Sequence, residues 1–195
     1  MGALFGSAMG IIIVGIVLVV LATMIITIYN NIIRTRNSVE ENVSAIDTVF
    51  QNRYDLIPNL VEVVKQYASH EKSILEEVTK LRSQAMSGQD MSKEKLEQEN
   101  MLSGTLKSIF ALSENYPDLK ANQNFIELQN QWTEIEDRMQ AARRAYNASV
   151  KALNDIKQMF PSNIIASFMT IKQYEMFEAS QEARKSLDAK ELFSK

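Results

Sequence analysis

The feature that most constrains this chain is its opening stretch, in which no charged side chain occurs before Arg34. The run GIIIVGIVLVVLATMIITI is apolar on every face, and as a helix it covers roughly 30 Å, the thickness of a bilayer's hydrocarbon core. Tyr29 follows, where an interfacial aromatic residue belongs. The sequence therefore predicts a transmembrane helix over residues 10–29, preceded by a short N-terminal segment of residues 1–9.

Two other structures are compatible with an apolar N-terminal run, namely a cleaved signal peptide and a buried core helix. A signal peptide usually begins with basic residues and has a shorter apolar stretch, and this run has no Lys or Arg at its start. A core helix is rarely apolar all round. We therefore expect a retained single span in contact with the lipid bilayer.

The basic residues predict the orientation of that span. Arg34 and Arg36 flank its C-terminal side, whereas no Lys or Arg flanks the N-terminal side. The positive-inside rule then places the body of the protein in the cytoplasm and the N-terminus outside. The expected location is the cell (inner) membrane, with a single pass.

Small residues at the start of the chain suggest helix packing in the membrane. Gly2, Gly6 and Gly10 share one face of a helix, and small residues there let two backbones approach closely in lipid. The alternative is that residues 1–8 lie outside the bilayer and are merely small and flexible. The sequence leaves both interpretations open.

Beyond the span, the apolar spacing and the scarcity of turn residues indicate long helices. The long remainder has only Gly88 and Gly104 and three prolines, too few for a β-rich fold. Apolar residues follow steps of three and four from Val39 to Ala85 and again from Phe125 to Phe160. The expected fold class is all-α: the membrane helix is followed by an elongated antiparallel helical bundle with long coiled-coil-like helices.

The breaks in this pattern give the expected boundaries of the helices. We expect helices over about 30–86, 91–115 and 122–160, a short helix over 163–171 and a C-terminal tail over 172–195. Pro58 lies within the first of them, where it removes a backbone donor and clashes with the carbonyl of Tyr54. It is expected to kink or break that helix.

Several runs in this part of the chain resemble the LemA family. They are Arg53–Val61 (RYDLIPNLV), Tyr116–Asn122 (YPDLKAN), Ala141–Arg144 (AARR) and Phe160–Asn163 (FPSN). The resemblance extends over about residues 29–168, with departures from the family pattern at Asn52, Ile135 and Ala152–Leu153. It implies an N-terminal membrane anchor and a helical-bundle body over residues 30–171, and it implies no chemistry.

Two charged residues, Arg53 and Glu71, occupy positions in the apolar ladder. A charge facing a helix seam is costly unless it is paired or reaches water. We expect structural polar contacts within the bundle, and the candidates are Arg53, Asp55, Asn59, Glu71, Glu136 and Arg143. One alternative is a seam that is open to solvent. A less favoured alternative is a ligand site that is built from Arg53, Asp55, Asn59, Glu136 and Arg143.

No enzyme signature accompanies these residues. The chain has no cysteine and a single histidine, His70, and it lacks the Glu-x-x-His motif of di-metal bundles. We therefore expect no catalytic residue, no metal and no cofactor. The net charge of −3 with interspersed acids and bases gives no basic stripe, so nucleic acid is not an expected partner.

A second apolar segment lies near the C-terminus. Its larger members are Ile164, Ile165, Phe168, Met169 and Phe177. They are expected to cap the end of the bundle, to contact a partner protein or to lie on the membrane surface.

Together these features predict a non-enzymatic, membrane-anchored scaffold that forms a homo-oligomer at the bilayer surface. The alternative is a membrane-tethered adaptor that binds an unidentified protein through its bundle surface or through the C-terminal apolar segment.

Overall fold

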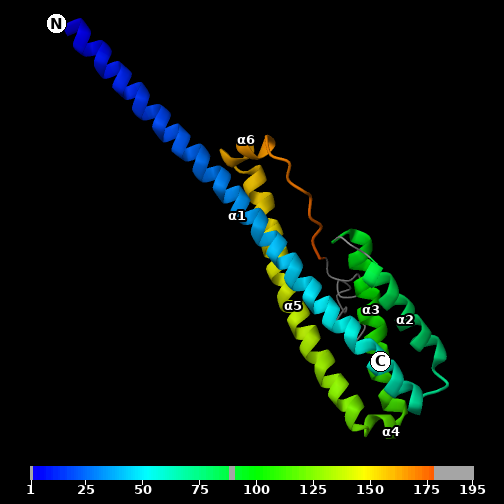
Figure 1. The fold of residues 1–195 in the computed structure, drawn as a ribbon. Coiled ribbons are helices and arrows are strands. Elements are labelled where there is room, and N and C mark those ends of the chain that lie inside the picture. The colour runs from blue at the N-terminus through cyan, green and yellow to red at the C-terminus, as the bar shows by residue number, and fades with distance from the viewer. Residues whose placement is uncertain (1, 88–90, 178–195) are drawn as a thin grey trace, which may run out of the picture. The chain divides into compact units, whose positions relative to one another are not determined.

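The computed structural model describes residues 2–87 and 91–177, and it is helical with no strand in these ranges (Figure 1). The all-α fold class is therefore confirmed. The elements are α1 (Gly2–Tyr67), α2 (Lys72–Ser87), α3 (Lys93–Leu112), the 3-10 helix η1 (Ser113–Asn115), α4 (Pro117–Lys120), α5 (Gln123–Gln158) and α6 (Ser162–Ser167).

The chain divides into two compact units, and α1 and α5 contribute to both. The first unit consists of residues 1–42 and 148–173, and the second of residues 43–147 and 174–195.

In the first unit, the apolar run of α1 is exposed along its length. Exposed members include Ile11, Val14, Leu18, Leu21 and Ile25. Within the described part of the chain, α1 is the one helix long and apolar enough to cross a membrane. Its threonines leave no hydroxyl unpaired, because Thr23 donates to the carbonyl of Val19 and Thr27 to that of Thr23, each at 2.8 Å.

The second unit is a bundle of four helices in which consecutive long helices run antiparallel. The side chain of Arg82 on α2 reaches the carbonyl of Tyr54 on α1. On α3, Lys95 and Glu99 meet Asp47 and Arg53 in the same order, so α3 runs parallel to α1. Residues 52–59 of α1 face 131–138 of α5, and 59–66 face 124–128, so α5 returns antiparallel to α1. Most of the interior is apolar, and its buried residues include Ile46, Phe50, Ile57, Leu60, Val78, Leu102, Leu106, Ile109, Phe125, Met139 and Tyr146.

The expected helix over 30–86 is two helices instead of one. α1 ends at Tyr67, and after Ala68–Glu71 the chain begins α2, which packs back against α1. The reversal leaves little trace in the sequence because none of the described residues has a positive φ, so the turn requires neither glycine nor asparagine. The apolar ladder continues across it because both helices face the same core.

Pro58 does not break α1, which continues nine residues beyond it. Because proline has no N–H, the carbonyl of Tyr54 loses its usual helical partner. The Nε of Arg82 donates to that carbonyl at 2.8 Å. A side chain from α2 thus replaces the missing backbone donor and ties the hairpin together.

The other expected boundaries fall within a few residues of those observed, with η1 and α4 as additional short elements. The expected tail over 172–195 is described only to Phe177, and Tyr174–Phe177 belong to the bundle unit. The remainder of the expected tail lies outside the described residues.

Candidate functional site

The most unusual feature of the bundle interior is a fully buried arginine. Arg53 is 0% exposed, on the same face of α1 as the core residues Phe50 and Ile57. Its Nη1 donates to Oε2 of Glu99 on α3 at 3.2 Å, and its Nη2 donates to Oε1 of Glu136 on α5 at 2.6 Å. The planar fork of the guanidinium therefore links three helices through two charge-assisted hydrogen bonds.

Neutral groups complete this arrangement. The hydroxyl of Tyr54 donates to the other oxygen of Glu99, and the hydroxyl of Ser103 donates to Glu136 at 3.2 Å. We call Arg53, Tyr54, Glu99, Ser103 and Glu136 the Arg53 cluster. Aromatic rings flank the cation, since the guanidinium carbon lies 5.9 Å from the Phe50 ring centroid and 5.5 Å from that of Trp132.

Two further cations lie around the Arg53 cluster. Lys95 is 3.5 Å from Asp47 and 5.5 Å from the Phe50 ring centroid. Arg143 donates to the side-chain oxygen of Asn100 at 3.2 Å and stacks 4.8 Å from the Phe177 ring centroid. With Arg53, Glu99 and Glu136, these groups give three cations and three carboxylates, so their formal charges cancel.

Burial shifts the titration of several of these groups. Burial raises the pKa of the Glu99 carboxyl, although the hydrogen bond from Tyr54 and the charge of Arg53 act in the opposite direction. Burial also raises the pKa of the Tyr54 hydroxyl, so it keeps its proton and donates. Burial, and then the like charge of Arg53, lower the pKa of Arg143. The cluster is thus a paired structural core with Arg53 and Glu99 closed off from solvent.

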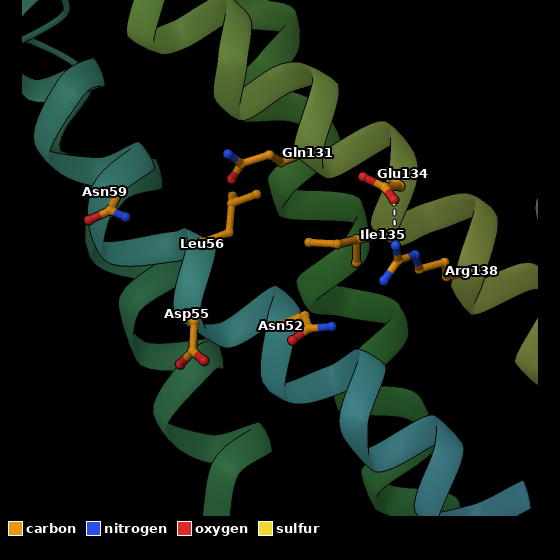
Figure 2. A pocket seen from close by; sticks show the side chains of 8 residues that line it. All are labelled: Asn52, Asp55, Leu56, Asn59, Gln131, Glu134, Ile135 and Arg138. Atoms are coloured by element: carbon orange, nitrogen blue, oxygen red, sulfur yellow. Dashed lines mark hydrogen bonds and ion pairs between the residues drawn. The ribbon is translucent and has the colours of Figure 1, made fainter.

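Asp55 and Asn59 face a different part of the surface, as Figure 2 shows. They line an open groove of about 360 Å³ between α1 and α5, with Leu56 and Ile135 beneath a polar rim. Asp55 accepts from the amide of Gln51 at 2.8 Å. Asp55 is two residues from Arg53, about 200° around the helix, so the two side chains point in nearly opposite directions.

The remaining polar candidates have separate partners. Glu71 lies at the turn between α1 and α2 and accepts from the hydroxyl of Tyr116 at 3.0 Å. Arg53 and Glu136 are in direct contact, and the charge of Arg143 interacts with both of them. Three residues of the less favoured ligand site, Arg53, Glu136 and Arg143, therefore lie near one another, whereas Asp55 and Asn59 lie at the groove.

The sequence prediction missed Glu99 and Lys95. Glu99 is 0% exposed and lies three residues from both Leu96 and Leu102, on the apolar face of α3. The same criterion that drew attention to Arg53, a charge within an apolar ladder, was present there.

The C-terminal apolar residues differ in their surroundings. Ile164 and Phe168 are exposed, whereas Ile165 and Met169 are half-buried. Phe177 is buried, contrary to the expected partner or membrane contact. It packs edge-on against Tyr146 with the ring centroids 5.6 Å apart, and its backbone N–H and carbonyl bond to the side chain of Asn147.

Of the small residues at the start of α1, only Gly10 has described surroundings. A Cβ placed on it would meet no atom within 4 Å. The surroundings of Gly2 and Gly6 lie outside the described part of the structure.

The comparison with known protein families agrees with the bundle and its motifs. The family model described as the LemA family matches residues 42–190. The chain belongs to the LemA family. It is also similar to protein LemA of Metamycoplasma hominis, with 26% identity over 167 residues that cover 84% of this chain and 74% of the relative. The resemblance predicted from the motifs is thus confirmed.

Several residues of the LemA runs have structural tasks. Arg53 and Tyr54 belong to the Arg53 cluster, and Tyr116 bonds to Glu71. Asn122 accepts from the backbone N–H of Phe125 at 3.0 Å and donates to the hydroxyl of Tyr67 at 2.9 Å. It thereby caps the start of α5 and fixes it against the end of α1. These LemA residues specify how the helices pack.

Proposed function

We propose that this LemA-family chain is a non-enzymatic scaffold, anchored in the membrane by α1, whose copies associate at the bilayer surface. The observation that carries this proposal is the exposed apolar run of α1. We further propose that the bundle lies in the cytoplasm, because Arg34 and Arg36 follow the run on the bundle side.

The exposed apolar run supports the membrane anchor. Ile11 is 73% exposed and Val19 66% exposed, which in water would leave about 1.5–3 kcal/mol of burial energy unused for each side chain. Lipid removes this cost. The intrahelical hydrogen bonds of Thr23 and Thr27 also satisfy the requirement that polar groups at membrane depth be paired within the protein.

The bundle supports a structural task. Its most buried charges, Arg53 and Glu99, are engaged with each other instead of facing a substrate-sized cavity. In the ranges 2–87 and 91–177, no group of three His, Cys, Asp or Glu side chains is placed to hold a metal ion.

Self-association is supported by the small-residue face of α1. The space around Gly10 is open in the single chain, so a second helix can approach its backbone closely. Val17 lies seven residues after Gly10 on the same face of α1, whereas Val19, nine residues after it, lies on the opposite face.

The proposal is tested with single cysteines, which the cysteine-free chain accepts without interference. Val17→Cys and Val19→Cys proteins are oxidised in native membranes and examined for disulfide-linked dimers. We expect efficient crosslinking at position 17 and little at position 19. A monomeric mass in mild detergent together with no crosslink at either position would contradict self-association. Equal crosslinking at both positions would contradict the glycine face.

A further inference from the structure

The junction between α5 and α6 lies beside the membrane helix. Pro161 and the α1 residues Val19, Val20, Thr23, Met24, Thr27 and Ile28 line one open groove of about 490 Å³. All of these residues belong to the first unit, and Figure 1 shows α6 at the end of α5, next to α1. The α1 residues of this groove form the bundle-side half of the predicted membrane span.

Large apolar side chains at this junction point away from the protein. We call Met159, Phe160, Pro161, Ile164 and Phe168 the α5–α6 tip. Phe160 is 80% exposed and Phe168 is 88% exposed, and Met159 and Ile164 are also more than half exposed. In water such a concentration of exposed apolar side chains would be unfavourable, so these residues indicate a contact.

The charge pattern around the tip matches a membrane interface. No charged side chain occurs between Lys157 and Lys172, which flank the segment. Flanking lysines suit anionic lipid headgroups, while the uncharged stretch between them suits the region below.

Hydrogen bonding within the tip is also suited to a medium without water. Several backbone N–H groups outside regular helix bonding have partners within the segment, since Asn163 donates to the carbonyl of Met159 and Phe168 to that of Ile165. The hydroxyl of Ser162 lies 2.7 Å from the carbonyl of Ile156, which the end of α5 would otherwise leave open, and 2.9 Å from that of Met159, which also accepts from Asn163. A loop in contact with hydrocarbon needs such internal pairing.

We propose that the α5–α6 tip inserts into the acyl-chain region of the leaflet on the bundle side, as a second membrane contact beside α1. This inference rests on the proposed membrane anchor, because α1 sets the depth at which the tip lies. Since Pro161 shares a groove with Val19–Ile28, a bilayer that surrounds these α1 residues also surrounds the tip. The lipid surface is favoured over a protein partner by this continuity with the apolar run.

The test places an environment-sensitive NBD fluorophore on single cysteines of the full-length protein in phosphatidylcholine–phosphatidylglycerol vesicles with brominated acyl chains. Ile164→Cys and Phe168→Cys report on the tip, and Val20→Cys reports on the anchor. Ala152→Cys, exposed on α5 nine residues before Pro161, is the matched control outside the bilayer. Circular dichroism verifies that each labelled protein is helical.

We expect quenching at positions 164 and 168 that is several-fold greater than at position 152 and approaches that at position 20. Quenching at position 20 with positions 164 and 168 matching position 152 would overturn the tip insertion and leave the anchor intact. A tip label that is shielded from lipid yet blue-shifted in native membranes would overturn it in favour of a protein partner. Absence of quenching at position 20 would overturn the anchor and the tip insertion together.

A second variant tests the cause of insertion. Phe168→Ser in the background of the label at position 164 removes the most exposed apolar ring of the tip, and we expect weaker quenching there. Gln173→Ser, a polar exposed position in the same unit, is the control and should leave the quenching unchanged. Equal quenching in both variants would contradict a role for Phe168 in holding the tip in lipid.

Discussion

The apolar run of α1 and the interior of the bundle place their side chains in opposite ways: the run exposes apolar side chains, and the bundle buries charged ones. In the run, residues such as Ile11 and Val19 are exposed, while in the bundle Arg53 and Glu99 are fully buried. Each arrangement costs free energy unless its surroundings compensate for it. The run needs an apolar surrounding medium, which we infer to be lipid, whereas the buried charges need partners, and neighbouring helices provide them.

The difference shows where the specificity of each region comes from. The side-chain hydrogen bonds described in the apolar run, those of Thr23 and Thr27, are internal to the helix, so under the proposed anchor lipid and small-residue packing would fix its position. In the bundle, Arg53 joins α1 to α3 and α5, so a change in helix register would leave charges unpaired at low dielectric. We infer that the Arg53 cluster sets the register of the bundle. Five predictions test this contrast.

The largest effect is expected from charges placed in the apolar run. Val17→Asp/Val20→Asp should cost about 5–7 kcal/mol of insertion free energy, because each aspartate in the middle of a span costs about 2.5–3.5 kcal/mol. The protein should move from the carbonate-washed membrane pellet to the supernatant. Gln129→Asp/Gln140→Asp, on exposed positions of α5, controls for added charge. A double variant that stays in the pellet would contradict the anchor.

Removal of the buried cation should be the next largest effect. Arg53→Ala leaves Glu99 and Glu136 without their main partner and should lower the free energy of unfolding by about 3–5 kcal/mol. Urea denaturation of the full-length protein in mild detergent measures this. Arg138→Ala, which removes an exposed pair with Glu134, should cost at most about 0.5 kcal/mol.

A double replacement sharpens the same point. Arg53→Met/Glu99→Leu removes both charges and should cost less than Arg53→Ala alone, because no buried carboxylate of Glu99 then lacks its cation. A double variant that keeps its stability but no longer holds a single helix register within the bundle would support the role of the cluster in specificity. If the double variant were much less stable than either single variant, the pairing account would be wrong.

The hydrogen bond that replaces the missing donor at Pro58 should have a smaller effect. Arg82→Ala should cost about 1.5–3 kcal/mol, since it leaves the carbonyl of Tyr54 unpaired. In a Pro58→Ala background the new N–H restores the helical bond, so the cost of Arg82→Ala should fall. A double-mutant cycle by urea denaturation measures this coupling, and strict additivity would contradict it.

The most subtle effect is a pH dependence. Because the pKa of Glu99 is raised in the folded state, its contribution to stability is complete below the ordinary pKa of 4.5 and is lost as the pH rises through the raised pKa. Glu99→Gln lacks this loss, so its stability relative to the unsubstituted protein should improve as the pH increases above 4.5. Glu134→Gln controls for the loss of one negative charge. A Glu99→Gln difference that is constant with pH would contradict the effect of burial.

The fold was predictable where the spacing of apolar residues and the residues that begin or end helices agree. The apolar ladders gave the helical class and the approximate limits of α3, α5 and the short α6. The turn at Ala68–Glu71 was not predictable from turn residues, because its backbone has ordinary negative φ values and needs no glycine or asparagine. The spacing of apolar residues also continues unchanged from α1 into α2. The length of the expected helix over 30–86 did not indicate a break either, since helices as long as α1 do occur.

The polar interior was predictable only in part. Arg53 was identified from its position in the ladder, and Glu99 carried the same signal on α3. Which carboxylate pairs with which cation depends on the register between helices, and a single sequence does not fix that register. Asp55 and Asn59 were grouped with Arg53 as candidates for polar contacts in the bundle, but helical geometry places them at the groove in Figure 2 and not in the Arg53 cluster.

The most direct test of the central claim is a spin-label scan along α1 in bilayers, using single cysteines at Val14, Val19, Met24, Asp47 and Gln51. Oxygen partitions into hydrocarbon, whereas a nickel chelate stays in water, so their effects on power saturation report depth. We predict that oxygen accessibility dominates at positions 14, 19 and 24, with a maximum near 19, and that nickel accessibility dominates at 47 and 51. High nickel accessibility at position 19 would show that water surrounds the apolar run, and it would contradict the account.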